Sequence, residues 1–269
     1  ITLESVFPRC SSITSITANL FRYNTIASTF TGTFQDCVGL TSIPVDLFRY
    51  NTASTTFGYC FYGCNNLTTI PVDIFRYNTL CQTFQQTFQN CSKITALPTD
   101  LFRYNTIVID FYSTFQSCTL LASLPTDLFR YNTLVTTFAQ CFLSCSSLTS
   151  IPSDLFQYNV LVNTFISTFS TSGLTSIPAN LFQYNINVTS FQSTFQACVG
   201  LTAIPAGLFA GNTLVTTFHQ TFYICNGLLA TAIPTDLFRY NTLVTTFQQC
   251  FQLCTKITTI PVDLFRYNT

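Results

Sequence analysis

The side chains that could bind a metal or act as nucleophiles in this 269-residue chain are thirteen cysteines and a single histidine. Nine cysteines share one phase of a repeat, and three others each precede one of these nine by four residues, which raises the question of local disulfides. Disulfide geometry is demanding, and a small buried thiol also suits such a position without any bond. A zinc site usually has four ligands with CxxC-type spacing, so we expect no metal site. The candidate disulfide residues are Cys60, Cys64, Cys141, Cys145, Cys250 and Cys254.

General acid-base catalysis needs one distinct group of residues with separately tuned proton affinities. The chain offers His219, which stands where another copy of the repeat has Gln85, and carboxylates that recur in most copies. Gly-rich phosphate loops, nucleophile elbows and zinc-protease motifs do not occur in the sequence. We therefore expect no catalytic residue and no cofactor, and a function other than that of an enzyme.

The elements that position these side chains are copies of one repeated unit. The segment DLFRYNT recurs from Asp46 to Asp263, once with Ile for Leu, and other copies are degraded. Successive Leu-Phe or Ile-Phe pairs, starting at Leu20, are 27, 27, 27, 27, 27, 26, 27, 29 and 27 residues apart. A period between about 20 and 50 residues is typical of a solenoid, whose units bury their apolar faces on their neighbours. The sequence thus predicts one solenoid domain over residues 1–269, without clear capping repeats.

One unit suggests a strand, a turn and a helical return segment. Residues Leu40–Ile43 alternate apolar and polar side chains and include β-branched ones, as a short strand does, and Pro44 ends that strand. Val135, Phe138, Phe142 and Cys145 recur at helical spacing, which favours a helical or 3-10 return. Threonine is a weak helix former, so a second strand at Leu-Val-Thr-Thr-Phe stays open. The predicted fold class is an α/β leucine-rich-repeat-like solenoid of about ten units with short parallel strands.

Three columns of the array contain all 29 phenylalanines, which predicts an aromatic core. One asparagine also occupies the same phase in all ten copies. These amides form either a ligand-binding row or, as we favour, a structural ladder in which each side chain satisfies backbone groups of the next turn. The ladder residues are Asn24, Asn51, Asn78, Asn105, Asn132, Asn159, Asn185, Asn212, Asn241 and Asn268.

Charge follows the repeat as well. Seven arginines share the column of Arg49 and seven aspartates share the column of Asp46, three residues earlier. The copy at Leu208 has lost both, with Gly207 and Ala210 in their places, which favours pairing of the two columns. Exposed pairs contribute only about 0–1 kcal/mol each. The alternative is that the row of arginines binds carboxylates or acidic sugars.

Composition excludes several partners. The formal net charge is zero and 7% of the residues are charged, so no basic field attracts nucleic acid. Polar residues interrupt every apolar stretch well before the roughly 20 residues of a spanning helix, so we expect no membrane span. The chain begins at Ile1 without a Met or a signal core, which suggests a processed product or part of a longer protein. Asn66 and Asn187 lie in Asn-x-Thr sequences and are candidate glycosylation sites.

The run TFQNCSKITALPTDLFRYNT at Thr87 to Thr106, with CFLSCSSLTSIPSDLFQYN from Cys141, resembles the BspA-like leucine-rich-repeat proteins of bacterial surfaces. Their units carry an aromatic residue, a Cys and then a Leu-Thr-Ser-Ile strand, and the resemblance covers the whole chain. It implies parallel strands on one face and a secreted or surface-attached protein that binds host proteins, other cells or matrix. The period of 27 residues and the Arg-Tyr-Asn-Thr turn depart from the family's common unit of about 23 residues.

Weakly capped ends lead to a functional hypothesis. A solenoid whose terminal turns expose core residues stacks on its neighbours, and contacts that do not close generate a filament. We predict an extracellular or cell-surface structural protein that polymerises with itself, head to tail, into a fibre. The alternative is an adhesion module of a larger surface protein that binds proteins or glycans through its strand face. The predicted assembly ends are Ile1, Leu3, Phe7, Phe265 and Tyr267.

Overall fold

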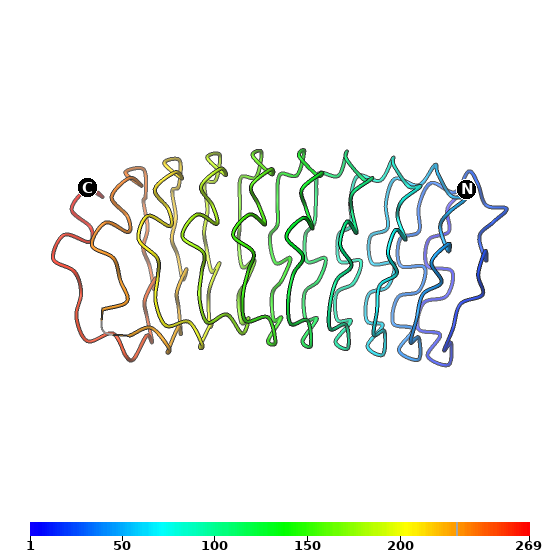
Figure 1. Ribbon diagram of the computed structural model, residues 1–269, viewed down its shortest axis with the longest axis horizontal. Helices are drawn as coiled ribbons and strands as arrows, with labels where there is room; N and C mark the ends of the chain where they lie inside the picture. Colours follow the sequence, from blue (N-terminus) through cyan, green and yellow to red (C-terminus); the bar gives the residue numbers. More distant parts are fainter. Residues whose placement is uncertain (230) are drawn as a thin grey trace.

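The chain forms an elongated stack of coils (Figure 1). The structure is a computed structural model that describes residues 1–229 and 231–269. Consecutive coils lie side by side along the long axis, and the two termini lie at opposite ends of the stack. The architecture is therefore a repeat solenoid, as the period of the sequence predicts.

Neighbouring coils are joined by a column of parallel backbone bridges, each a single residue long. Thr29 pairs with Thr56, one repeat further along, and Thr164 pairs with Ser190 across the shorter repeat. The register between coils is therefore that of the sequence repeat. The bridging residues are Thr2, Thr29, Thr56, Thr83, Asp110, Thr137, Thr164, Ser190, Thr217 and Thr246.

The bridges run through the Leu-Val-Thr-Thr-Phe segment, so the strand predicted at Leu-Thr-Ser-Ile is largely misplaced. On that side the described residues form one bridge, between Ala96 and Ser123. The other Leu-Thr-Ser-Ile segments contribute sparse contacts, such as the N–H of Thr41 donating to the Thr14 carbonyl at 3.3 Å. The proline that follows has no N–H to donate and ends the pairing. The alternative second strand at Leu-Val-Thr-Thr-Phe is the one that carries the bridge column.

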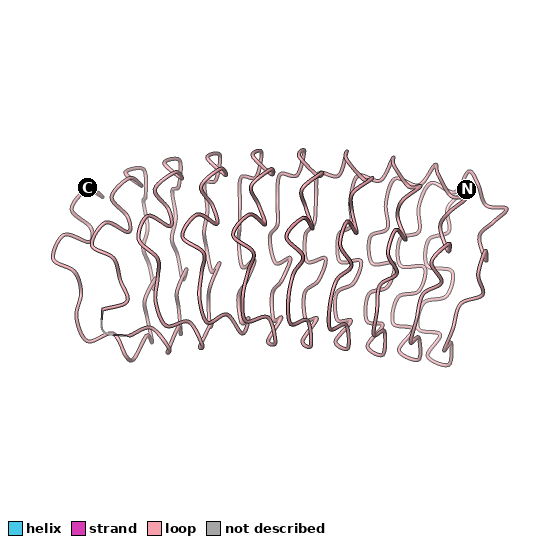
Figure 2. Ribbon diagram, in the orientation of Figure 1, coloured by secondary structure: helices cyan, strands magenta, loops and turns pink. Residues whose placement is uncertain are grey.

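The predicted helical return is wrong, because the residues that the structure describes include no helix (Figure 2). Tandem four-residue turns take its place. The N–H of Cys60 donates to the Phe57 carbonyl at 3.0 Å, and the N–H of Cys64 donates to the Phe61 carbonyl at 3.2 Å. The third residue of each turn has positive φ, as in type II turns. Turns of four residues place Phe, Phe and Cys at spacings of four and three, which a helical face also produces.

The backbone N–H groups that do not close these turns donate to the next coil. The N–H of Tyr59 donates to the Gln85 carbonyl at 2.9 Å, and the N–H of Phe61 donates to the Thr87 carbonyl at 2.9 Å. Every second residue of this segment therefore donates its backbone N–H to the next coil, and residues between them donate within their own turn. These N–H groups are unavailable for the i to i−4 bonds of an α-helix, which is the physical reason that the return is not helical.

The three phenylalanine columns stack through the core. Phe102 lies between Phe75, at 6.3 Å and 10°, and Phe129, at 6.2 Å and 5°, and it meets Phe111 of a second column at 4.7 Å and 53°. Its side chain is fully buried. Offset-stacked and tilted rings are the favoured geometries of aromatic pairs. The predicted aromatic core is present, and rings such as Phe102 contact rings of both neighbouring coils.

Coil spacing differs between the two sides of the core. Successive rings of the Leu-Phe column, such as Phe209 and Phe238, lie 5.9 to 6.4 Å apart. Successive rings of the column of Phe34, beside the turns, lie 5.6 to 5.9 Å apart. The Leu-Phe side is therefore the wider, convex side of a gently curved stack.

Candidate interaction surfaces

The asparagine column lies inside the stack. Asn105 Nδ2 donates to the backbone carbonyl of Phe75 at 3.1 Å and to that of Asn78 at 2.9 Å, both in the preceding coil. Asn51 through Asn268 repeat this pair of bonds, and Asn24, in the first coil, has no preceding coil to bond. Asn51 to Asn241 are fully buried, so these amides join coils and present no surface to a ligand.

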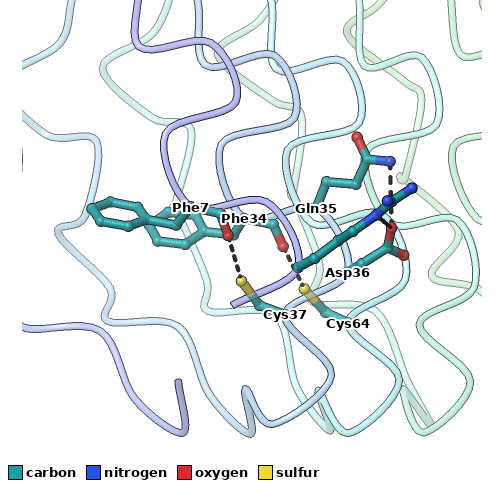
Figure 3. Close-up of polar contacts among 7 residues, drawn as sticks. Phe7, Phe34, Gln35, Asp36, Cys37 and Cys64 are labelled. Atoms are coloured by element: carbon teal, nitrogen blue, oxygen red, sulfur yellow. Dashed lines mark hydrogen bonds and ion pairs between the residues drawn. The ribbon is translucent and has the colours of Figure 1, made fainter. Parts of the chain in front are cut away.

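A second buried column consists of thiols. Cys37 Sγ donates to the Phe7 carbonyl at 3.1 Å, and Cys64 Sγ donates to the Phe34 carbonyl at 3.2 Å (Figure 3). Burial raises the pKa of Cys145 to about 12 and the pKa of Cys198 to about 11. These are inert thiols, because the thiolate is the reactive form.

The six candidate disulfide residues are free thiols in the structure, as are the other seven cysteines. Cys60 takes the place that Thr33 and Thr87 hold in other coils, where the hydroxyl donates to backbone carbonyls. Cys64 lies in the neighbouring column and directs Sγ to the preceding coil. The four-residue spacing therefore reflects two successive turns, each with its own backbone partners, and Cys141 with Cys145 and Cys250 with Cys254 repeat it.

His219 and Asp110 are single departures from the repeat. His219 lies on the bridge side, where its backbone N–H donates to Thr217 Oγ1 at 3.1 Å. Asp110 replaces a bridging threonine and accepts the N–H of Tyr112 at 2.6 Å, and burial raises the pKa of its carboxyl. Among the described residues, no three His, Cys, Asp or Glu side chains lie together as metal ligands do.

The two candidate glycosylation sites bond to the preceding coil. Asn66 Nδ2 donates to the Val38 carbonyl at 2.7 Å, and Asn187 Nδ2 donates to the Val160 carbonyl at 2.9 Å. Asn187 is exposed and Asn66 is half-buried. A glycan on either side chain would have to displace its bond.

Sequence reasoning missed an amide-rich surface beside the bridge column, which we name the amide strip. Its side chains hydrogen-bond to one another, as between Gln86 Nε2 and Gln89 Oε1 at 2.6 Å and between Gln220 Nε2 and Gln249 Oε1 at 2.7 Å. Unlike the core columns, these positions differ widely between coils, and that variation was the available signal. Representative members are Tyr59, Tyr62, Gln85, Gln86, Gln89, Tyr112, Gln116, Gln140, Gln192, Gln196, His219, Gln220, Tyr223, Gln248 and Gln249.

A second surface, on the convex side, stacks guanidinium groups between tyrosine rings. Arg76 Cζ lies 5.7 Å from the ring centre of Tyr77 in its own coil and 5.2 Å from that of Tyr104 in the next. Arg76 also pairs with Asp73, at 3.5 Å from Nη1 to Oδ2. The run is continuous through the first coils and is interrupted at Gln157. We name it the Arg–Tyr ridge: Arg22, Arg49, Arg76, Arg103 and Arg130, with Tyr23, Tyr50, Tyr77, Tyr104, Tyr131 and Tyr158 and the aspartates Asp46, Asp73, Asp100 and Asp127.

Both ends of the stack expose apolar side chains. Ile1 is 67% exposed at the first coil and Val262 is fully exposed at the last. Phe265 and Tyr267 are also exposed, whereas Leu3 and Phe7 are half-buried against the core. The structure thus places the predicted assembly residues at the two opposite ends of the stack.

Comparison with known proteins shows a likeness of fold. No family model and no curated protein matches the chain. One solved structure that it resembles is a chain of the Drosophila Toll–Spatzle complex, with 18% sequence identity and a TM-score of 0.34. The match covers 86% of this chain and 40% of that chain. They also include the leucine-rich-repeat domain of the type III effector XopL, at 14% identity, 97% and 70% coverage and a TM-score of 0.44. A leucine-rich-repeat protein of Bacteroides ovatus follows at 16% identity, 90% and 85% coverage and a TM-score of 0.29.

The second and third of these proteins are leucine-rich-repeat proteins. This chain spans about two fifths of the chain of the Toll–Spatzle complex that it matches. All three TM-scores are below 0.5, so the likeness assigns no family, and the BspA-like resemblance stays a prediction. The described residues contain no helical segment with the length and hydropathy needed to span a bilayer.

Proposed function

We propose that this protein is a non-enzymatic, extracellular recognition module that binds neutral glycans or polar protein surfaces through the amide strip. The observation that carries the proposal is that this strip combines hydrogen-bonding amides, hydroxyls and tyrosine rings, with the carboxyls of Asp36 and Asp110 beside them. Amides both donate and accept, which suits hydroxyl-rich ligands, and tyrosine offers a ring face beside a polar group. The rigid coil register holds these groups at fixed intervals, which lowers the entropy cost of binding.

Binding assays with matched variants test this function. The probes are a panel of neutral polysaccharides and purified surface proteins, applied to the immobilised chain. Gln192→Lys with Gln196→Lys changes the strip, and Gln183→Lys makes the same change on the convex side, where Gln183 is exposed. We expect the strip variant to lose most of the binding and the control to retain it. The absence of any binder in the panel, or equal binding by both variants, would count against the function.

A second candidate function is head-to-tail assembly, and hydrogen-bond polarity favours it. At most junctions four N–H groups of one coil donate to carbonyls of the next, as Phe218 donates to Thr246 and Phe222 to Cys250. In the described part of the chain, the equivalent N–H groups of the last coil have no acceptor. The first coil presents the matching carbonyls, of Thr2, Glu4, Val6 and Pro8, which accept no backbone N–H from residues 1–229 or 231–269.

Stacking the last coil of one copy on the first coil of another would therefore pair donors with acceptors, whereas other end contacts would not. It would also cover apolar side chains at both ends. We expect wild-type protein to form filaments in electron micrographs and Phe265→Lys to abolish them. Phe265 is 43% exposed, so the interior should keep its unfolding temperature. Filaments that persist in this variant, or a wild-type protein that stays dispersed, would exclude end stacking.

A further inference from the structure

The Arg–Tyr ridge carries charge in two rows that run the length of the first coils. Three of its arginines pair with the aspartate three residues earlier, at 3.7 Å for Arg49, 3.5 Å for Arg76 and 3.1 Å for Arg103. Because the coils stack in register, the carboxylates form one row and the guanidinium groups form a second row beside it. Both rows remain accessible: the Arg76 side chain is 47% exposed and that of Asp73 is 34% exposed.

The ridge carries five arginines and four aspartates and has a fixed lateral polarity. An anionic polymer would meet a carboxylate beside Arg49, Arg76 and Arg103 and gain little there. A surface with the same two rows in opposite lateral order would place each carboxylate against a guanidinium group. Arginine can accept this second partner, since its planar group has five N–H donors and the carboxylate of its own coil occupies one edge.

From this we infer that a second copy of this chain binds ridge to ridge, with the two solenoid axes parallel. A two-fold axis parallel to the solenoid reverses the lateral order of the rows, so aspartates of one copy face arginines of the other. A two-fold axis across the solenoid keeps the lateral order, and like charges then face each other. The charge rows therefore select the parallel arrangement, in which both copies have the same polarity.

Neighbouring side chains suit the ridge to burial against a second copy. Tyr77 is 39% exposed, and Leu80, two residues beyond Asn78, is 50% exposed. Tyrosine and arginine are enriched in the energetically dominant parts of protein interfaces. The aromatic rings already hold each guanidinium group in place, so little side-chain entropy remains to be lost on binding. The run is interrupted at Gln157, and the same stacking resumes in the last coils, where Arg239 lies against Tyr240 and Tyr267.

Sedimentation velocity on the Phe265→Lys background separates this lateral contact from end stacking. We expect dimers whose affinity falls as salt rises, because exposed ion pairs are screened. Replacing Arg76, Arg103 and Arg130 with glutamine, the residue found at Gln157, removes three guanidinium groups and should weaken dimerisation roughly tenfold or more. Gln183→Ala, in the same column beyond the ridge, should leave dimerisation unchanged. A monomeric parent, or equal dimerisation by the triple glutamine variant, would overturn the inference.

A charge-swap variant tests the parallel arrangement. In this variant Asp73→Arg and Asp100→Arg are combined with Arg76→Asp and Arg103→Asp, which exchanges the rows. The swapped chain should form dimers with itself but not mixed dimers with the parent, because parallel mixed dimers place like charges together. Mixed dimers that form in preference to both homodimers would show antiparallel packing and overturn the proposal. Circular dichroism confirms that each variant is folded before it is compared.

Discussion

Asn105 Nδ2 lies 2.9 Å from the backbone carbonyl oxygen of Asn78, the residue that holds the same position in the preceding coil. This contact makes the side chain of one coil part of the backbone hydrogen bonding of its neighbour. It repeats along the column, so the cohesion of the stack depends on the same amide at each junction.

Asn105→Ala should destabilise the chain by about 1–3 kcal/mol, because two buried carbonyls each lose one of their two donors. The free energy of unfolding in urea measures this loss. Asn24→Ala is the matched control, since Asn24 belongs to the same column but has no coil before it. A similar loss in both variants would show that the bonds to the preceding coil are not the cause.

Phe102→Ala should cost about 3–5 kcal/mol, since it removes a fully buried ring that contacts rings of two other coils. Phe265→Ala changes the same column at the last coil, where the ring is 43% exposed, and should cost less. Thermal unfolding of both variants gives the comparison. Equal costs would mean that burial between coils does not determine the contribution of the ring.

Native protein should react with an alkylating reagent at Cys10 alone, and at all thirteen cysteines in denaturant. Cys10 is the exposed member of its column and the others are buried. Intact mass after labelling counts the modified thiols. Rapid labelling of Cys60 or Cys64 in the native state would contradict the buried, hydrogen-bonded positions that the structure gives them.

Stability should fall as pH rises above about 9, where unfolded thiols begin to ionise. Folded Cys145 keeps its proton up to about pH 12, because burial raises its pKa to about 12. Between these values the unfolded state binds fewer protons, so each such thiol lowers the free energy of unfolding by about 1.4 kcal/mol per pH unit. Cys145→Ser, the residue that Ser172 supplies in this column, should flatten the slope measured by urea unfolding. An unchanged slope would exclude this thiol as a contributor.

Asp110→Thr should stabilise the chain at neutral pH, because threonine is the usual bridging residue and the Asp110 carboxyl has a pKa raised by burial. A raised pKa means that the carboxyl contributes its stability in acid and loses it as pH rises through the folded pKa. The gain should therefore be larger at neutral pH than near pH 4, about the ordinary pKa of aspartate. Thr137→Asp, at the next bridge, should have the opposite effect. A gain that does not depend on pH would contradict this explanation.

The period and the apolar columns made the coil stack, the aromatic core and the asparagine column predictable from sequence. The tandem turns were not, because Tyr59 and Gln86 occupy positive-φ positions where a sequence signal would be glycine. The placing of Phe57, Phe61 and Cys64 fits helical spacing over so short a segment, and the inter-coil hydrogen bonds decide against the helix. Each arginine of the Arg–Tyr ridge lies between tyrosine rings of two coils. Which tyrosine of the next coil it meets depends on the register between coils, and that register is known only from the structure.

The column spacing also determines how the stack responds to tension. In the Leu-Phe column each coil adds 5.9 to 6.4 Å of length, yet it contains about 27 residues that extend to about 90 Å when pulled straight. A coil peeled from one end under load would lengthen roughly fifteenfold while the remaining coils keep their contacts. When both ends of the chain are held under load, the stack therefore lengthens one coil at a time, and breaking each junction between coils absorbs work.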